Sequence, residues 1–466
     1  MASLSALKFT VRRKPAVLLT PAAPTPRELK PLSDVDDQNG LRFLIANIFF
    51  FERRHSGRDV DDPVPVIRDA IAAALVHYYP LAGRIRELEG QKLAVDCTGE
   101  GALFVEADAD DVRLEQFGTQ PPFPGVDELL FDLPGSNEVL DAPLLHFQVT
   151  RLACGGFVLA FKIHHCVVDG QGVVQFMEAV AELARGAAAP TVRPVWGREL
   201  LMAPCNDTAP LRFAHREYDV VEPDPDERPA MVHRSFFFGP TEAAAVRSHL
   251  PPALRRVAST FDVLMGFLWK CRTAALAPRD RDEMRLLFTT SVRGKKKQGG
   301  GEPFIPVGYY GNSFATPAAI STAGALRAKP VGYAVDLVRK ARREVDVEYL
   351  QSVARFMVRS GRPQLALLHA YLVSDVSKAG FDAIDVGWGK PVYGGTMRCS
   401  LDTSPVICSF LTAGKNTIGE EGIILPVCLP APAMDKFVEE MSNLLRPYDH
   451  VTAQPNNISP VIKAAL

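Results

Sequence analysis

Apolar residues along this chain follow two spacings, one typical of strands and one typical of helices. The run from Phe157 to Ile163 is rich in β-branched and aromatic residues, and it predicts a buried strand. After it, apolar positions recur at helical spacing between Gln171 and Arg185, which predicts a helix with one apolar stripe. The pattern therefore places His164 and His165 where a strand ends and the helix has not yet begun.

The same two patterns continue through the rest of the chain. Further strands are predicted at residues 7–13, 41–51, 85–88, 92–95, 144–151, 233–238, 284–291, 370–373, 406–410 and 422–429. Further helices are predicted at residues 64–79, 260–276, 331–345 and 432–445. Because strands alternate with helices in both halves, we expect an α/β fold built in layers.

The stretch from Gly186 to Pro229 has a different composition, because prolines interrupt every apolar pattern in it. Such a stretch is typical of a long connection between two domains. The chain has 466 residues, enough for two or three domains with ample cores. We therefore expect an N-terminal domain at 1–190, a crossover loop at 191–230 and a C-terminal domain at 231–466.

Charge and apolar content exclude several classes of function. Lysine and arginine number 52 against 54 acidic residues, for a net charge of −2, so a nucleic-acid binder is not expected. The N-terminus lacks an apolar signal region, and the most apolar run, Phe43 to Phe51, is too short to cross a bilayer. The eight cysteines form no C-x-x-C pair, which suits reduced thiols in the cytoplasm. We expect a cytoplasmic protein without membrane contact.

His164 and His165 sit at a strand end, where a scaffold can hold an imidazole beside an open space. Consecutive side chains on a strand point to opposite faces, so one histidine can face a cleft while the other packs inside. A neutral imidazole in a cleft is a good proton acceptor near pH 7. Asp169 has two interpretations, an acid that orients the histidine or a helix N-cap. Cys166 could be a nucleophile or a small packing residue.

The remaining histidines are scattered and form no H-x-x-x-H pair with His164 or His165. A metal site would need a third and a fourth ligand, so no metal site is expected. A G-x-S-x-G elbow, a Walker A loop and a complete G-x-G-x-x-G are absent from the sequence. These absences weaken the acyl-serine, NTPase and dehydrogenase interpretations.

Four motifs together resemble one known family. His164-His165-x-x-x-Asp169-Gly170 resembles the HHxxxDG signature of the plant BAHD acyl-CoA-dependent acyltransferases, and 385–389, Asp-Val-Gly-Trp-Gly, resembles their DFGWG. Residues 79–84 (Tyr-Pro-Leu-Ala-Gly-Arg) and 308–312 (Gly-Tyr-Tyr-Gly-Asn) are further matches. The motifs follow the family order and approximate spacing over essentially the whole chain. Val386 departs from the pattern, because the family usually has phenylalanine there, and this puts local packing in doubt more than catalysis.

The resemblance implies a fold and a mechanism. The fold would have two similar-sized chloramphenicol-acetyltransferase-like domains, each with a mixed β-sheet flanked by helices, and a solvent channel between them. His165 would act as general base on an alcohol that attacks the thioester directly, without an acyl-enzyme, while His164 would be structural. The partners would be an acyl-CoA co-substrate and a small alcohol, and no cofactor would be needed. The resemblance also implies that the protein is a monomer.

The resemblance also assigns supporting residues. Asp169 would turn away from the histidine and pair with an arginine, for which Arg293 is the candidate, and Gly170 completes the motif. The second motif would be largely structural and near the CoA side, through Asp385, Gly387, Trp388 and Gly389. Trp388 is interpreted as either core or channel wall.

A basic, glycine-rich loop runs from Arg293 to Gly301. The positive charges of this loop either attract the phosphates of CoA or belong to a solvated, mobile loop that binds nothing. Ser259 and Thr260 either cap a helix or also receive a phosphate or pantetheine group. The candidate CoA contacts are therefore Ser259, Thr260, Arg293 and Lys295.

Substrate identity is the least constrained expectation. Segments 11–16, 32–38, 371–375 and 390–395 resemble the benzyl-alcohol and alcohol acyltransferase branch of the family, and they are also similar to grass p-coumaroyl-CoA:monolignol transferases. The leading hypothesis is transfer of a p-coumaroyl or related hydroxycinnamoyl group to a monolignol-like primary alcohol. The alternatives are a benzoyl-CoA:benzyl alcohol O-benzoyltransferase, a non-catalytic CoA-ester-binding protein, and a relative of peptide-synthetase condensation domains.

Overall fold

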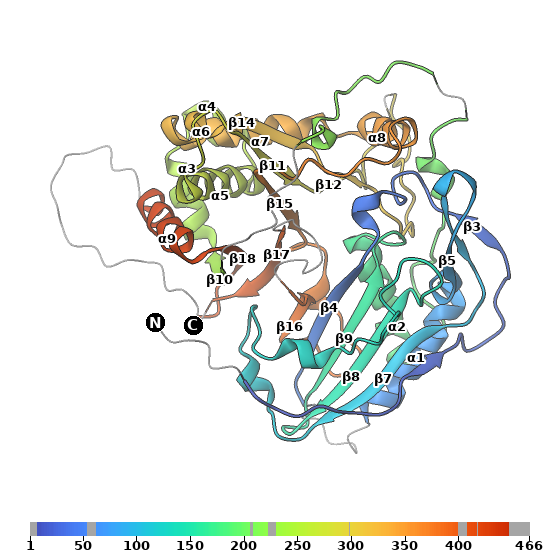
Figure 1. The fold of residues 1–466 in the computed structure, drawn as a ribbon. Coiled ribbons are helices and arrows are strands. Elements are labelled where there is room, and N and C mark those ends of the chain that lie inside the picture. The colour runs from blue at the N-terminus through green and yellow to red at the C-terminus, as the bar shows by residue number, and fades with distance from the viewer. Residues whose placement is uncertain are drawn as a thin grey trace.

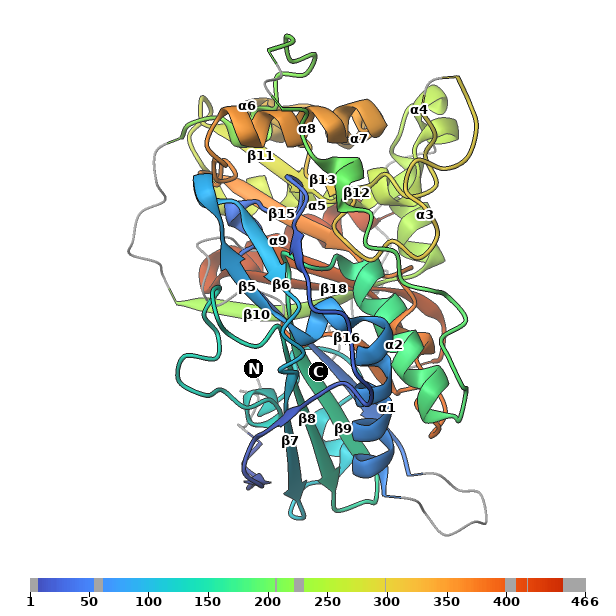
Figure 2. The same ribbon diagram turned by 90° about the vertical axis from the view of Figure 1, so that its right-hand side faces the viewer.

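The computed structural model describes residues 7–53, 62–205, 208–221, 230–297, 299–398, 408–416 and 418–446. Within them the chain forms two large β-sheets, each covered by helices (Figures 1 and 2). The strands of the first sheet are β1 (Arg12–Arg13), β2 (Val17–Leu19), β4 (Leu44–Phe51), β7 (Ala102–Ala109), β8 (Leu145–Leu152), β9 (Phe157–His164) and β16 (Tyr393–Thr396). The strands of the second sheet are β10 (Met231–Phe238), β11 (Glu283–Phe288), β14 (Ala318–Thr322), β15 (Ala370–Asp375), β17 (Cys408–Lys415) and β18 (Glu421–Pro430).

Both large sheets are mixed. The first has the order β1-β7-β8-β9-β4-β16, with β2 also paired to β7, and its β7 and β8 are parallel while the other pairs are antiparallel. The second has the order β10-β18-β17-β15-β11-β14, and its β15 runs parallel to both neighbours. The expected α/β class with two mixed sheets is confirmed.

One strand connects the two halves of the chain. β16 lies far downstream in the sequence, yet it pairs antiparallel with β4, with Gly395 opposite Ile48. Two smaller sheets complete the architecture: β3 (Leu29–Pro31) with β6 (Leu93–Asp96) and β5 (Arg84–Glu87), and β12 (Thr290–Ser291) with β13 (Phe314–Ala315). The sequence around the second motif therefore enters the first sheet, although it follows most strands of the second.

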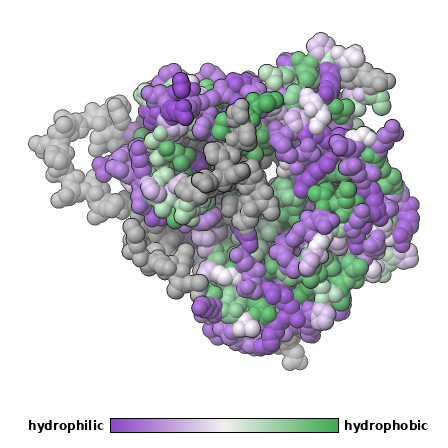
Figure 3. Space-filling model, viewed as in Figure 1, coloured by the Kyte–Doolittle hydropathy of each residue, from purple (hydrophilic) through white to green (hydrophobic). Residues whose placement is uncertain are grey.

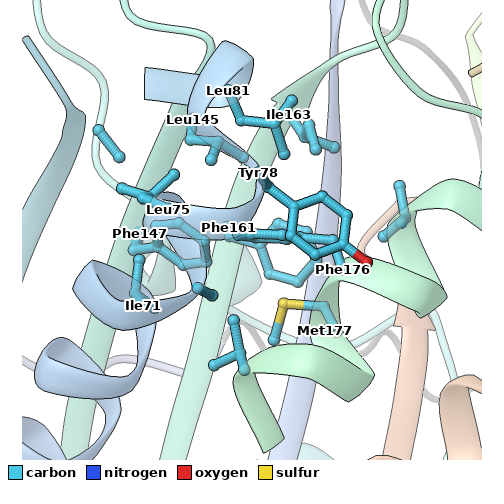
Figure 4. Close-up of a cluster of buried hydrophobic side chains, with 14 of the residues drawn as sticks. Ile71, Leu75, Tyr78, Leu81, Leu145, Phe147, Phe161, Ile163, Phe176 and Met177 are labelled. Atoms are coloured by element: carbon cyan, nitrogen blue, oxygen red, sulfur yellow. The ribbon is translucent and has the colours of Figure 1, made fainter. Parts of the chain in front are cut away.

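Helices α1 (Pro63–His77) and α2 (Gly170–Ala184) lie side by side on the first sheet (Figure 2). Figure 4 shows the core between them and β8 and β9, where Tyr78, Phe161 and Phe176 meet. Both helices begin at an aspartate, since Asp62 accepts from the backbone N–H of Val64 and Asp169 from that of Gly172. Such caps satisfy amide groups that the first helical turn leaves free.

The second sheet carries the other helices, α3 (Pro240–Ser248), α4 (Pro252–Val257), α5 (Thr260–Leu276), α6 (Ala323–Ala328), α7 (Val331–Glu344), α8 (Val347–Arg359) and α9 (Ala431–Leu445). Helix α5 is buried along most of its length and packs between α7 and α9. Its Gly266 permits this approach, because a Cβ there would lie 2.5 Å from the backbone nitrogen of Val335. The predicted helix at 260–276 is confirmed at both ends.

The predicted strand at 7–13 is wrong in extent, because only Arg12–Arg13 pair, as β1 with β7. Leu7, Phe9 and Val11 instead pack their side chains on a buried cluster that includes Phe117. The first part of the predicted strand at 406–410 lies outside the described residues, and β17 begins at Cys408.

Polar residues dominate the surface, with apolar patches between them over both parts of the molecule in the view of Figure 3. Among the helices of the described ranges, not one combines the length and the apolar character that crossing a membrane requires.

Candidate active site

The two histidines lie where strand β9 reaches the end of the first sheet. His164 is the last residue of β9 and lies opposite Leu44 of β4. His165 is the first residue beyond the strand, and its backbone N–H donates to the carbonyl of Phe43 at 2.9 Å. The two side chains therefore have different surroundings, as the alternation of a strand predicts.

His164 is a structural residue. It is 2% exposed, and its Nδ1 accepts a hydrogen bond from the backbone N–H of Cys166 at 3.3 Å. Burial, followed by the nearby His165, lowers its pKa to about 3. The ring is therefore neutral near pH 7, and its burial keeps it from contact with a substrate.

His165 is partly exposed and lies between two aromatic rings. The ring centroids of Phe43 and Phe314 are 5.3 and 6.1 Å from that of the imidazole. Its Nδ1 is buried, so Nε2 is the nitrogen that can meet a substrate. Burial lowers the pKa of His165 below its ordinary value, which keeps the imidazole neutral and able to accept a proton near pH 7.

Asp169 caps helix α2 and also forms an ion pair. Its Oδ1 accepts from the backbone N–H of Gly172 at 2.9 Å and from Nη2 of Arg293 at 2.7 Å. Its Oδ2 accepts from the backbone N–H and hydroxyl of Ser313 at 3.2 and 3.3 Å. The side chain thus holds together three segments of the chain, as the N-cap of α2 and as the ion-pair partner of Arg293.

Arg293 extends this connection to the Gly-Tyr-Tyr-Gly-Asn segment. Its Nη1 donates to the carbonyl of Tyr309 at 2.7 Å, and its Nη2 donates to that of Gly311 at 2.8 Å. The start of α2 packs closely on the same segment, because a Cβ on Gly172 would lie 1.9 Å from the carbonyl oxygen of Tyr310. Gly170 has more space, since the nearest atom to its Cβ would be a methyl of Val376 at 3.4 Å.

Three buried residues of this region received no role in the sequence analysis, although Asp36 and Asn312 lie in segments that resemble the family; the third is Arg198. Arg198 Nε lies 2.8 Å from Asp36 Oδ2, and both side chains are 0% exposed. Asn312 donates from Nδ2 to Asp36 Oδ1 and to the backbone oxygen of His165, both at 2.8 Å. The available signal was weak, because these residues are separated by more than a hundred positions in the sequence.

Cys166 is a packing residue. It belongs to the buried core under the first sheet, and its Sγ lies 3.3 Å from the carbonyl oxygen of Leu41. Burial raises the pKa of the thiol well above its ordinary value, so a thiolate nucleophile is not formed there.

Three of the four candidate CoA contacts, Ser259, Arg293 and Lys295, have protein partners, and Thr260 is exposed. Ser259 and Asp262 form a capping box at the start of α5, and Thr260 is the first residue of that helix. Lys295 donates to the backbone oxygen of Val345. Arg293 is committed to Asp169 and two carbonyls, as described above. The structure therefore gives these residues local roles, and their contact with CoA stays a proposal.

The second motif lies at the opposite end of β9 from His165. Asp385 accepts from the backbone N–H groups of Gly387 and Gly389, both at 2.8 Å, and closes a tight turn. Val386 is 0% exposed, and Trp388 packs edge-on against Phe157, the first residue of β9. At roughly 3.3 Å per strand residue, the motif is more than 20 Å from His165. It borders a cavity of about 670 Å³ that Trp388 also lines.

Within the described ranges, no group of three or more histidine, cysteine, aspartate or glutamate side chains is arranged to hold a metal ion.

Comparison with known proteins agrees with this geometry. The model of the Transferase family matches residues 7–444. The chain is 50% identical over 450 residues to benzyl alcohol O-benzoyltransferase of Petunia hybrida, covering 95% of each protein. It is 48% identical over 442 residues to alcohol acyltransferase 16 of Actinidia chinensis var. chinensis, covering 94% of each. The crystal structure of vinorine synthase superposes with a TM-score of 0.70 at 19% identity, covering 93% of this chain and 98% of that one.

Proposed function

Since the chain belongs to the Transferase family of BAHD acyltransferases, and is therefore an acyl-CoA-dependent alcohol acyltransferase, we propose that it transfers a benzoyl group from CoA to benzyl alcohol or a similar primary alcohol. Two relatives that are 50% identical, from Petunia hybrida and Nicotiana tabacum, are named benzyl alcohol O-benzoyltransferase. These names support benzoyl transfer better than the p-coumaroyl and monolignol hypothesis, because the relatives reported above are not named for p-coumaroyl or monolignol substrates.

The observation that carries the proposal is the neutral, partly exposed imidazole of His165 at the end of β9. Nε2 takes the proton of the alcohol while the alcohol oxygen forms a bond to the thioester carbonyl carbon. The tetrahedral intermediate then expels the CoA sulfur, and the imidazolium returns its proton to the thiolate. The products are an ester and free CoA thiol, and His165 ends neutral as it began.

This sequence of steps needs no protein nucleophile. Cys166, the cysteine next to the base, is buried with a raised pKa, which supports direct transfer over an acyl-enzyme. We further propose that acyl-CoA and alcohol reach His165 through a channel between the two sheets, and that no resident cofactor or metal takes part. Arg293, Lys295, Ser259 and Thr260 lie on the C-terminal part of the chain, and contact with CoA there is part of the same proposal.

We propose that the protein acts as a monomer in the cytoplasm. The described cysteines 97, 154, 166, 205, 271, 408 and 428 are free thiols, which supports a reducing compartment.

A matrix of acyl donors and alcohols tests the substrate proposal. Benzoyl-CoA, p-coumaroyl-CoA and acetyl-CoA would each be offered with benzyl alcohol, hexanol and coniferyl alcohol, and both ester mass and released CoA would be measured. We expect the highest kcat/KM for benzoyl-CoA with benzyl alcohol. A tenfold higher value for p-coumaroyl-CoA with coniferyl alcohol would restore the hydroxycinnamoyl hypothesis, and an absence of CoA release with every pair would favour a non-catalytic binding protein.

A further inference from the structure

Two phenylalanine rings, those of Phe43 and Phe314, flank the imidazole of His165. The centroid of the Phe43 ring lies 5.3 Å from that of the imidazole at an interplanar angle of 56°, and the Phe314 centroid lies 6.1 Å away at 62°. Both side chains are half-buried, and within the described ranges neither belongs to any of the four buried apolar clusters. Large rings left partly open beside the proposed base point to a ligand rather than to core packing.

The backbone fixes Phe43 next to His165. The carbonyl oxygen of Phe43 accepts from the backbone N–H of His165 at 2.9 Å, and the next residue, Leu44, pairs with His164 in the first sheet. Ile45 packs on the core under that sheet, whereas the ring of Phe43 contacts the imidazole. The position of this ring relative to the imidazole is therefore set by the sheet itself.

Phe314 reaches the same imidazole from the C-terminal half of the chain. It lies in β13, where it pairs with Ser291 of β12, and the next residue, Ala315, is buried. The residue before it, Ser313, donates to Asp169 Oδ2 at 3.2 and 3.3 Å. The imidazole is thus flanked by one ring from each half of the chain, and both rings belong to segments that hydrogen bonds hold in place.

The reacting atoms must lie close to these rings. Nδ1 of His165 is buried, so the substrates approach Nε2. General-base catalysis brings the alcohol oxygen within hydrogen-bond distance of Nε2, and the thioester carbonyl carbon is the next atom along. A group that is bonded directly to this carbon therefore lies within reach of the two rings that contact the imidazole.

We propose that Phe43 and Phe314 are specificity-determining residues that receive the acyl group of the donor and favour an aryl ring bonded directly to the thioester carbonyl. This inference rests on the proposed function and deepens it, because it names the side chains that select benzoyl-CoA. Aromatic rings attract one another in tilted and offset arrangements, beyond the effect of the apolar area that they bury. An acetyl group has no ring to make this contact, and the two-carbon spacer of a p-coumaroyl group carries its ring past the position of a benzoyl ring.

Two features favour the donor over the alcohol as the partner of these rings. The benzoyl ring is conjugated with its carbonyl and arrives as one rigid plane, whereas the ring of benzyl alcohol turns about a methylene group and loses that freedom on binding. Phe314 also lies on the side of the proposed CoA contacts, because the hydroxyl of its partner Ser291 accepts from the backbone N–H of Arg293 at 3.1 Å.

Phe43→Leu and Phe314→Leu test the proposal, because leucine keeps an apolar side chain but removes the ring. Benzoyl-CoA and acetyl-CoA would each be offered with saturating benzyl alcohol, and the ratio of their kcat/KM values would be compared with the wild-type ratio. We expect each variant to lower the ratio of benzoyl-CoA to acetyl-CoA by about three- to tenfold, the scale of one aromatic contact. Phe43→Tyr and Phe314→Tyr keep the ring, so they should keep the ratio within about twofold.

Phe356→Leu is the matched control. Phe356 is also half-buried, and its ring centroid also lies 5.3 Å from that of an imidazole, but this imidazole belongs to the buried His215. The variant therefore loses the same kind of contact at a histidine that is not the proposed base. We expect it to keep the wild-type ratio of benzoyl-CoA to acetyl-CoA, even if its melting temperature falls.

A wild-type measurement tests the same inference without any variant. Cyclohexanecarbonyl-CoA carries a ring of similar size without a π-system, and we expect its kcat/KM to be at least about threefold below that of benzoyl-CoA. An equal or higher value overturns the inference, and so do folded leucine variants that both keep the wild-type donor ratio.

Assignment of the rings to the alcohol is tested with acetyl-CoA as the fixed donor. A lowered ratio of benzyl alcohol to hexanol in the leucine variants, at an unchanged donor ratio, overturns the proposal. Failure of the proposed function has a different signature, because it is read from the wild type alone as a higher kcat/KM for p-coumaroyl-CoA with coniferyl alcohol, whatever the variants do.

Discussion

Asp169 and Arg293 form an ion pair that joins positions 124 residues apart, with Arg293 Nη2 at 2.7 Å from Asp169 Oδ1. The same aspartate oxygen caps helix α2 through Gly172. The two side chains are 7% and 21% exposed, so the pair is largely shielded from water. Asp169, the acid of the histidine motif, thus anchors the loop after His165 to Arg293 in the C-terminal half of the chain.

We expect Asp169→Asn to lower the free energy of unfolding by about 3 kcal/mol, because Arg293 would keep a shielded charge without its partner. Urea denaturation of Asp169→Asn, Arg293→Met and the double variant would measure this. The double variant should be more stable than the sum of the single losses predicts, since the two residues interact. The kcat of the remaining folded protein should fall much less than the amount of soluble protein.

A normally stable Asp169→Asn protein with no activity would contradict this role. It would mean that Asp169 acts on His165 electrostatically and that its contacts with Arg293 and Gly172 contribute little to folding.

We expect His165→Ala to reduce kcat by at least about 10³-fold, because general-base catalysis typically contributes 10² to 10⁴ and the neighbouring imidazole, His164, is buried. Binding of CoA, measured by calorimetry, should stay within a factor of about three, since the imidazole does not contact the nucleotide in the proposed mechanism. His233→Ala removes an exposed imidazole on β10 and serves as the control. Turnover by His165→Ala at a near wild-type rate would refute the assignment.

Much of the fold was predictable because local patterns specify it. Strands β8 and β9 and helix α5 followed from apolar spacing and capping residues alone. β7, in contrast, was missed although it pairs with β1, β2 and β8, because its sequence, Ala-Leu-Phe-Val-Glu-Ala-Asp-Ala, mixes strand and helix formers. Its strand conformation comes from its neighbours in the sheet, which a local pattern does not encode.

The candidate site also has a part that a local sequence pattern predicts and a part that depends on contacts between distant segments. His165 and its position beyond a strand could be predicted, since both lie in one short motif. The contacts that hold it could not, because Asp36, Arg198 and Asn312 come from three distant segments, and their importance follows from burial and distances. The partnership of Asp169 with Arg293 was reached only through the family resemblance, for the same reason.

We expect Asp385→Ala to reduce stability by about 1–2 kcal/mol while leaving kcat within twofold, because the side chain accepts two backbone hydrogen bonds in its turn. The turn lies at the opposite end of β9 from His165, so the loss should not reach the chemistry. Denaturation midpoints and steady-state rates on the same preparations would measure both quantities. A large fall in kcat without a change in stability would place the second motif in the catalytic or CoA-binding machinery.

The stability of the protein should fall in mild acid because two buried histidines resist protonation. Burial, followed by the charge of Lys162, lowers the pKa of His146 to about 4, and that of His164 is lowered to about 3. In the unfolded chain both return to about 6.5. Between pH 6.5 and 4 the unfolded state therefore binds more protons than the folded state, so the free energy of unfolding falls as the pH falls.

Chemical denaturation at stepped pH values would test this for His146, which is 0% exposed in β8. We expect His146→Leu to reduce the slope of unfolding free energy against pH in this window by up to about 1.4 kcal/mol per pH unit, the value for one proton. Gln148→Leu, in the same strand and equally buried, carries no titrating group and should shift stability by an amount independent of pH. Parallel curves for the wild type and His146→Leu would show that His146 does not titrate differently in the two states, and the acid sensitivity would then have to come from other groups.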